Sequence, residues 1–261
     1  MPEGDVALRV ARRLDQALGT GALTRSELRW AELGGVDLTG EHVTAVVSHG
    51  KHLLIRTGSG HTVHSHLRMD GSWQIEHTRT PPRPLEHWRI RAVLATSRWT
   101  CVGRDLGMLA VVPTHAEHRV LGHLGPNLMA ADPDLAQARA NALAEGSRPI
   151  GETLLDQRVA AGIGTIYLAE TLWIHRISPW RPVSAVADVG AVYRTATTLM
   201  RRSADAPQLT ATGELAPGRR THVHDRAGLG CRRCGHPIDV GQIGSPPQAR
   251  PGFFCPACQE S

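Results

Sequence analysis

Two pairs of cysteines constrain the fold of this chain more than any other feature. Cys231 and Cys234 form one CxxC pair, Cys255 and Cys258 form a second, and residues 235–254 separate them. Each pair can place two thiolates on one metal ion, and the spacing suits a hairpin that closes a tetrahedral zinc site. Four sulfur ligands leave no open position for water, so the sequence predicts one structural Zn²⁺ and no catalytic one.

The composition indicates a protein with a substantial core and a polyanionic partner. The chain has 261 residues, is 41% hydrophobic and carries a formal net charge of +5. No apolar run approaches the roughly 18 residues of a membrane-spanning helix, and the start lacks the pattern of a signal peptide. We therefore expect a soluble cytoplasmic protein without a membrane segment, and separately we expect it to be a monomer. In that compartment cysteines favour metal binding over disulfides, and Cys101, far from the two pairs, is expected in the core.

The order of the patterns along the chain predicts an α+β protein of three domains. Val6, Val10, Leu14 and Leu18 have helical spacing after Pro2. Short strand-like runs follow, at 43–47, 51–56, 62–66, 90–95 and 109–112. We expect an N-terminal β-sandwich with an opening helix over 1–125, a helical domain over 126–225 and a zinc finger over 226–261. A linker is expected at 126–133, and Gly162-Ile163-Gly164 breaks the helical pattern before residues 166–175.

Lys51 is the one lysine among 29 basic residues. Arginine stays protonated, whereas a lysine amine can lose its proton and act chemically. A chain that uses arginine for general charge but keeps a single lysine indicates that an amine is needed there. The alternative is a GC-rich genome in which one lysine survives by chance. Lys51 follows a glycine at the start of an apolar strand, which favours the functional interpretation.

The N-terminus is a second candidate for chemistry. Removal of Met1 before the small residue Pro2 would expose a secondary amine. An α-amine titrates near pH ~8, so part of it is unprotonated at neutral pH and can attack a carbonyl-like carbon. Glu3 follows directly and could carry protons for it. Many proteins begin with Met-Pro by accident, so this motif alone is weak.

Four motifs in the same order resemble the formamidopyrimidine-DNA glycosylase and endonuclease VIII family of DNA-repair enzymes. They are Pro2-Glu3-Gly4, Lys51, the Gly162-Ile163-Gly164 turn and the four-cysteine finger. Residues 154–167 are similar to the helix–two-turn–helix segment of that family. Residues 248–256 are similar to the tip and exit strand of its zinc finger. The resemblance spans essentially the whole chain and implies a bifunctional DNA glycosylase and abasic-site lyase of base-excision repair.

The resemblance also implies a role for each matched residue. Pro2 attacks the anomeric carbon of the damaged nucleoside and forms a Schiff base, while Glu3 protonates the sugar and assists departure of the base. Lys51 contacts phosphate near the lesion and assists elimination, and Arg250 grips the phosphates that flank the flipped nucleotide. Cleavage by β,δ-elimination leaves a one-nucleotide gap, so damaged DNA is the expected partner.

Two loops are candidates to fill the space that a flipped nucleotide leaves. Flipping costs a few kcal/mol, and an inserted apolar side chain is one way to stabilise the gap. Met69 is a flexible apolar candidate, and Arg68 beside it could meet the orphaned base. Arg104 and Leu106 belong to a second such loop, and His87 is a candidate phosphate contact. The alternative for each is a core or solvated side chain.

Gly164 and Thr165 are predicted to lie on the DNA. Glycines allow close approach of a backbone, and free N–H groups at a helix start favour an anion. The family usually has Asn at the position of Thr165, whose shorter side chain could weaken activity. The family opening Pro-Glu-Gly-Pro-Glu is also changed, since Asp5 and Val6 replace its last two residues. A second carboxylate is therefore absent or displaced to Asp5.

Several functions stay open at this point. Residues 66–73 and the Arg-Pro tip look closer to endonuclease VIII, which implies oxidised pyrimidines as substrates. The alternative substrates are oxidised purines, including formamidopyrimidines. A damage-binding module without catalysis is a different class, because scaffold and chemistry are separable. A zinc-finger RNA or ribosomal binder is a third, but it leaves Pro2 and Glu3 unexplained.

Overall fold

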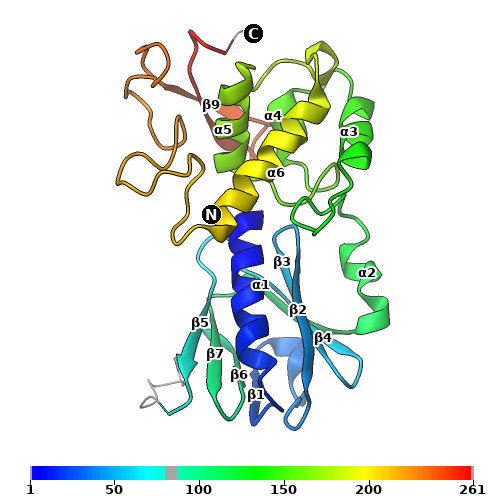
Figure 1. Cartoon of the computed structure of the whole chain (residues 1–261). Coiled ribbons are helices and arrows are strands. Elements are labelled where there is room, and N and C mark those ends of the chain that lie inside the picture. Colours follow the sequence, from blue (N-terminus) through cyan, green and yellow to red (C-terminus); the bar gives the residue numbers. More distant parts are fainter. Residues whose placement is uncertain (1, 80–86, 260–261) are drawn as a thin grey trace. The chain divides into compact units, whose positions relative to one another are not determined.

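The computed structural model describes residues 2–79 and 87–259, and the chain divides into two compact units. One unit contains Pro2 and residues 6–122; the other contains residues 3–5 and the chain from His123 onwards. Strands dominate the first unit and helices the second (Figure 1). The α+β class with an N-terminal β-sandwich is confirmed. Within the described ranges, no helix combines the length and hydropathy needed to cross a membrane.

Two four-stranded antiparallel sheets form the sandwich of the first unit. In spatial order, one sheet contains β1 (Arg25–Leu28), β6 (Ile90–Ala95), β7 (Trp99–Arg104) and β5 (Ser72–His77). The other contains β2 (Val43–His49), β3 (His52–Thr57), β4 (His61–His66) and β8 (Met108–Pro113). Short helical pieces accompany them: α2 (His118–Leu121) and single 3-10 turns at Ala31–Leu33 and Thr114–Ala116. The strand patterns in the sequence correspond to β2, β3, β4, β6 and β8.

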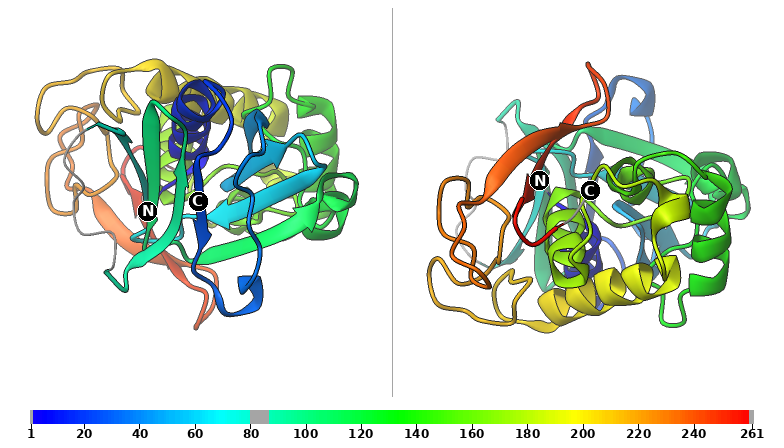
Figure 2. Two further views of the ribbon diagram at one scale, coloured as in Figure 1. Left: turned by 90° about the horizontal axis from the view of Figure 1, so that it is seen from below. Right: turned by 90° about the horizontal axis from the view of Figure 1, so that it is seen from above.

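Helix α1 (Gly4–Leu18) supplies the helical part of this core (Figure 2). Ala7, Ala11, Leu14 and Leu18 are its buried positions, whereas Val6 and Val10 are only partly buried. The expected helix is therefore confirmed, but its inner face is centred on alanines. Small side chains allow the helix to approach the sheets closely. Cys101 is fully buried in the same core, as expected, and burial raises the pKa of its thiol to about 12.

Four helices form most of the second unit: α3 (Leu135–Ala144), α4 (Ile150–Leu155), α5 (Thr165–His175) and α6 (Val189–Asp205), with a 3-10 turn at Val183–Ala185. Aspartates cap two of them, since Asp134 accepts from the Gln137 N–H and Asp188 accepts from the Ala191 N–H. Residues 167–173 of α5 are all buried, and they include the polar residues Glu170 and Thr171.

Residues 126–133, expected to be a linker, are part of this packed unit. Leu128 and Met129 are buried, and the Leu128 N–H donates to the Ala161 carbonyl at 3.1 Å. Proline and polar residues at both ends suggested a connection, but the apolar pair between them is drawn into the helical core. The segment is thus anchored beside the turn that precedes α5.

A two-stranded hairpin, β9 (Asp239–Ile243) and β10 (Arg250–Phe254), carries the second half of the cysteine segment. Trp180 packs on Gly241, where an added Cβ would lie 2.4 Å from the indole ring. The Trp180 Nε1–H also donates to the Gln242 carbonyl at 3.0 Å. The finger predicted as a third domain therefore belongs to the same compact unit as the helices.

Candidate active site and metal centre

The start of α5 binds the side chain of Glu3. Its carboxylate accepts the N–H of Gly164 at 2.8 Å, of Ile166 at 2.8 Å and of Tyr167 at 3.4 Å, and the residue is buried. These are first-turn donors that have no partner within the helix, and they stabilise a negative charge. A Cβ at Gly164 would lie 2.4 Å from Glu3 Cδ, so only glycine leaves room for this acid.

The N–H groups at the start of α5 differ from what the sequence suggested for a phosphate site at Gly164 and Thr165. The sequence suggested that free N–H groups at the helix start await an external anion. In the structure the Gly164 N–H is bound by Glu3, an internal anion. Thr165 adds a hydroxyl that lies 3.4 Å from His224 Nε2. Contact of Gly164 and Thr165 with DNA stays a prediction.

Asp5 anchors the same N-terminal stretch from the other side. Its Oδ2 accepts the Tyr167 hydroxyl at 2.5 Å and the Ser203 hydroxyl at 2.7 Å, and all three residues are buried. Burial and the charge of Asp5 raise the pKa of Tyr167, so this phenol stays protonated as a donor. Gly4 donates its N–H to the Gly162 carbonyl at 2.9 Å. Residues 3–5 are thus fixed to α5 and α6, next to a half-buried Pro2.

Lys51 occupies the two-residue turn between β2 and β3 in the first unit. Gly50 precedes it with a φ of 55°, a left-handed conformation that favours glycine. His52 pairs with His66 on β4 across the sheet. Burial, followed by the charges of Lys51 and Arg68, lowers the pKa of His66 to about 4. A neutral imidazole therefore accompanies the one lysine of the chain.

Sequence reasoning missed the histidine cluster of β3 and β4 that begins next to Lys51. His52 Nδ1 and His64 Nε2 lie 2.9 Å apart, and the His52 and His66 rings lie 4.8 Å apart. The Arg68 N–H donates to His66 Nδ1 at 2.9 Å, which leaves the proton of the neutral ring on Nε2. The sequence does place His64 and His66 on the same face of one strand. Their partner on β3, His52, is set by the register between the two strands, which the sequence does not show.

Two loops are candidates to fill the space left by a flipped nucleotide, and they differ in how exposed their apolar side chains are. Met69 is 59% exposed, and Arg68 beside it is also exposed with a φ of 52°. Leu106 in the second loop is 3% exposed, and it packs against Gly103, where a Cβ would lie 2.7 Å from its Cδ1. Leu106 would have to leave the core to insert into DNA, so we no longer propose that it fills the gap in the stack. Met69 stays a prediction.

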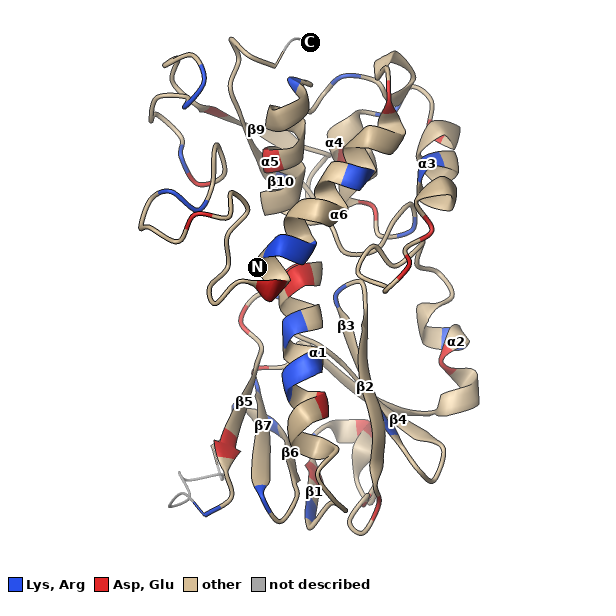
Figure 3. Cartoon of the chain, in the orientation of Figure 1, with Lys and Arg blue, Asp and Glu red and all other residues tan. Residues whose placement is uncertain are grey.

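The remaining candidates of the first unit lie near its surface. Arg104 donates from Nε to Gln74 Oε1 at 3.1 Å, a contact between neighbouring strands. His87 is exposed, and its ring stacks on Trp88 with centroids 5.7 Å apart. Neither position conflicts with a DNA contact. Figure 3 shows further basic residues along α1, on α6 and in the chain between α6 and β9.

The four cysteines converge in the second unit as their spacing predicts. Their sulfur atoms all lie within 4.8 Å of one another: Cys231, Cys234, Cys255 and Cys258. Tetrahedral zinc with Zn–S bonds of about 2.3 Å needs such a separation. Burial opposes ionisation of Cys231, but N–H donors including Trp173 Nε1, 3.3 Å from its sulfur, lower its pKa to about 6. The donor set fits one divalent metal ion.

The surroundings of this cluster are cationic. A cavity of about 350 Å³ adjoins two of the cysteines and is lined by Arg176, Arg181 and Arg233. Four thiolates with one divalent cation carry a net charge of about −2, which these guanidinium groups can offset. Arg250, by contrast, is exposed at the first residue of β10, opposite Ile243 and at the other end of this strand from Cys255.

Comparison with known proteins covers the whole chain. Residues 1–106 match the formamidopyrimidine-DNA glycosylase N-terminal domain, and residues 124–212 match the H2TH domain of the same glycosylase. Endonuclease 8 2 of Mycobacterium tuberculosis is 42% identical over 263 residues, which cover 99% of this chain and 100% of that protein. The DNA-(apurinic or apyrimidinic site) lyase Nei2 of Mycolicibacterium smegmatis is 38% identical, with 99% of each chain covered.

The similarity to solved structures also extends over the whole chain. A solved structure of MutM in complex with DNA that contains carbocyclic 8-oxo-G has a TM-score of 0.82 over 100% of both chains. Its sequence identity is 21%, so it establishes the common fold and nothing finer.

Proposed function

Because the chain belongs to the formamidopyrimidine-DNA glycosylase and endonuclease VIII family and is a base-excision repair DNA glycosylase and abasic-site lyase, we propose that Pro2 is its nucleophile and that oxidised pyrimidines are its preferred lesions. One observation carries this proposal. The N–H groups that begin α5 hold the Glu3 carboxylate, so an acid is fixed directly beside residue 2. The preference for pyrimidines is supported by full-length relatives that are named endonuclease 8.

The first chemical step uses the N-terminal amine. With Met1 removed, the unprotonated Pro2 nitrogen attacks C1′ of the damaged nucleoside, and the bond from C1′ to the base breaks. Glu3 starts as a carboxylate stabilised by backbone donors, so it can accept the amine proton and deliver it to O4′ of the sugar, while the departing base takes a proton from water. The C1′–O4′ bond then breaks and the sugar ring opens. The secondary amine then forms an iminium ion, which withdraws electrons from the sugar and acidifies its C2′ proton.

The second step cleaves the strand. Loss of the C2′ proton expels the 3′ phosphate, and a further elimination expels the 5′ phosphate. Lys51 contacts a phosphate near the lesion in this proposal, and neutral His66 beside it adds an Nε2–H donor. Thr165 and Arg250 contact flanking phosphates, and Met69 fills the gap in the stack.

Borohydride trapping tests the nucleophile. The processed protein should form a covalent adduct with abasic DNA, since borohydride reduces the iminium ion. Pro2→Gly supplies a primary amine and should retain part of the trapping, whereas protein that keeps Met1 should form none. Trapping by protein with a retained Met1 would exclude Pro2. Protein with a verified Pro2 terminus that binds lesions without trapping would be a damage-binding module.

A base-release panel tests the substrate. Thymine glycol, dihydrouracil and 8-oxoguanine are placed in otherwise identical duplexes, and the released bases are quantified. We expect both pyrimidine lesions to be released faster than 8-oxoguanine. Predominant release of 8-oxoguanine would instead favour an oxidised-purine glycosylase.

We further propose that the metal is one structural zinc ion held by Cys231, Cys234, Cys255 and Cys258. The four sulfurs, the N–H donors and the nearby arginines support this assignment. When bound, the ion would clamp the chain and take no part in the reaction. Metal analysis should give one zinc per chain. The proposal also includes a monomer that works on DNA in the bacterial cytoplasm, and native mass spectrometry tests the oligomeric state.

A further inference from the structure

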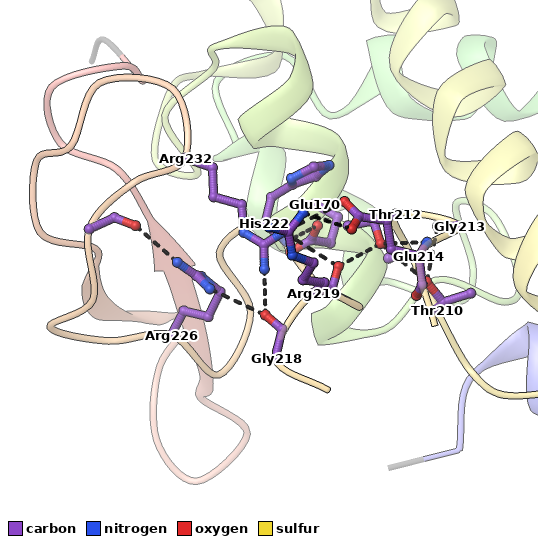
Figure 4. Close-up of polar contacts among 12 residues, drawn as sticks. Glu170, Thr210, Thr212, Gly213, Glu214, Gly218, Arg219, His222, Arg226 and Arg232 are labelled. Carbon is purple, nitrogen blue, oxygen red and sulfur yellow. Dashed lines mark hydrogen bonds and ion pairs between the residues drawn. The ribbon is translucent and has the colours of Figure 1, made fainter. Parts of the chain in front are cut away.

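Residues 210–224, hereafter the connecting segment, join the end of α6 to the chain that enters the first cysteine pair. Thr210, Ala211 and Val223 are buried, but none of residues 212–222 is. A stretch with so little buried surface takes its order from hydrogen bonds, and such stretches open at low free-energy cost. Figure 4 shows its polar groups in contact with Glu170 and Arg232, with one another around Thr210, and with Arg226, which reaches the Gly218 carbonyl at 3.4 Å.

Glu170 on α5 holds the end of the connecting segment. Its two carboxylate oxygens accept the N–H of His222 at 2.7 Å, of Val223 at 2.9 Å and of His224 at 3.0 Å. Glu170 is fully buried, so these donors are its compensation for lost hydration. This carboxylate therefore fixes three consecutive residues against the helix.

Trp173 lies one turn further along α5 and contacts both the connecting segment and the cysteines. Its ring stacks on His222, with centroids 4.2 Å apart and planes 20° apart. Its Nε1–H donates to Cys231 Sγ at 3.3 Å. The Arg233 guanidinium lies 4.1 Å from the ring centroid, and it donates to the Trp173 carbonyl at 3.0 Å. One side chain thus joins a metal-ligand position to the connecting segment.

Arg232, between the two cysteines of the first pair, provides the second connection. Its guanidinium donates to the Gly218 carbonyl, and it lies 3.5 Å from the Arg219 carbonyl (Figure 4). It also lies 4.0 Å from a Glu214 oxygen. Within the segment, Arg219 pairs with Glu214 at 3.2 Å. The exposed part of the segment is therefore fastened to a residue that two predicted zinc ligands flank.

We propose that Arg232 and Trp173 are positioning residues that couple metal binding at the four cysteines to the order of the connecting segment. A bound metal fixes Cys231 and Cys234, so the backbone between them presents Arg232 to Gly218. Loss of the metal frees this pair, and Arg232 and Cys231 lose their fixed places relative to α5. Glu170 still holds residues 222–224, and Arg202 and Arg226 still donate to the carbonyls of Ala211 and Gly218, but the contacts of Arg232 are lost and the exposed part of the segment opens more often.

The coupling reaches the predicted DNA contact at Thr165. His224 ends the connecting segment, and its Nε2 lies 3.4 Å from the Thr165 hydroxyl at the start of α5. An ordered segment therefore keeps an imidazole beside a residue assigned to phosphate. This consequence rests on the proposed function and on the proposed zinc ion, whereas the contacts of Arg232 and Trp173 do not depend on DNA.

Limited digestion with trypsin tests the coupling without DNA. Cleavage after Arg219 or Arg220 within the segment is followed by mass spectrometry in zinc-loaded, chelated and zinc-restored protein. We expect chelation to raise this cleavage roughly tenfold, because proteolysis follows the population of the open form. Restored zinc should reverse it. Arg232→Ala should raise cleavage similarly while one zinc per chain is still bound.

Arg194→Ala is the matched control, because it removes an exposed guanidinium on α6 that pairs with Asp188 at 3.0 Å. It should leave the cleavage rate unchanged. In Arg232→Ala, chelation should increase the cleavage rate by a much smaller factor than in the wild type, because the contact between Arg232 and the connecting segment is already lost. Arg232→Lys keeps a cation and should show intermediate cleavage; it replaces the alanine variant if that one does not fold.

Two results would overturn the coupling. One is zinc-loaded Arg232→Ala with wild-type protection of the segment. The other is chelation that opens the segment by the same factor in Arg232→Ala as in the wild type. Either result can occur in protein that traps abasic DNA normally, so failure of the coupling is distinguishable from failure of the proposed function. Protein without zinc would contradict the metal assignment itself.

Discussion

At the scale of single residues, the absence of a side chain at Gly164 leaves the space that the Glu3 carboxylate occupies. An added Cβ would lie 2.6 Å from Glu3 Oε1, so Gly164→Ala must displace the carboxylate or the first turn of α5. Losing a buried hydrogen bond to a charged group costs about 1–3 kcal/mol. We expect this variant to trap abasic DNA at least roughly tenfold more slowly.

Gly21→Ala is the control for that measurement, because nothing lies within 4 Å of a Cβ at Gly21. The Gly21→Ala variant should form the covalent adduct with abasic DNA at the wild-type rate. Wild-type trapping by Gly164→Ala would show that the contact between Glu3 and α5 has no part in the chemistry.

The lowered pKa of His66 predicts how the stability of the folded protein depends on pH. Its pKa falls from 6.5 to about 4 in the folded protein, chiefly because of burial. Below pH 6.5 the unfolded chain binds a proton that the folded chain does not, so stability decreases as pH falls from 6.5 towards 4. We expect a loss of about 2 kcal/mol, after allowing for partial exposure of the ring.

Urea unfolding at pH 7 and pH 5 measures this effect in the wild type and in His66→Gln. The glutamine variant should lose less stability between the two pH values. His222, whose pKa is also lowered to about 4, is present in both proteins and cancels in the difference. Equal losses in both proteins would mean that His66 is protonated in the native state.

At the scale of elements, α5 links several parts of the second unit. Its first turn binds Glu3, and Tyr167, Glu170 and Trp173 follow at intervals of three residues. This spacing places them along adjoining surfaces of one helix. They contact Asp5, the connecting segment and Cys231 respectively. This one helix therefore organises both the N-terminus and the metal centre.

The hairpin of β9 and β10 allows a prediction about DNA affinity. Arg250 is exposed where the chain enters β10, so Arg250→Ala should leave the fold intact. Loss of one phosphate contact should weaken binding to all lesions alike and make the slope of log affinity against log salt shallower by about 0.9. Binding titrations at several salt concentrations measure this slope, with Arg194→Ala as the control. A loss confined to one sequence context would show that Arg250 reads a base.

At the scale of the whole molecule, each of the two units has its own set of buried side chains, and the cysteines belong to the second. Zinc removal should therefore increase amide hydrogen exchange in α5 and in the hairpin of β9 and β10. Strands β3 and β4 should keep their protection, because their core lies within the first unit. Equal deprotection of β3 and β4 would mean that the chain unfolds as one cooperative body.

The sequence by itself determined those features that depend on residues close together in the chain. The CxxC spacing placed four sulfurs around one point, helical spacing predicted α1, and glycines marked the turns at Lys51 and before α5. Together they sufficed to identify the family and the α+β fold. Each follows from local backbone geometry, which a short stretch of sequence already specifies.

The tertiary structure decided what depends on partners distant in the chain. Glu3 meets α5 more than 160 residues away, and His52 meets His64 through the register of two strands. Leu106 resembles an exposed loop residue in sequence but is buried in the sandwich core. Strands β1 and β5 were missed because they are stabilised by sheet pairing more than by their own pattern. Burial and pairing arise when remote segments pack together, and a local pattern does not specify which segments will meet.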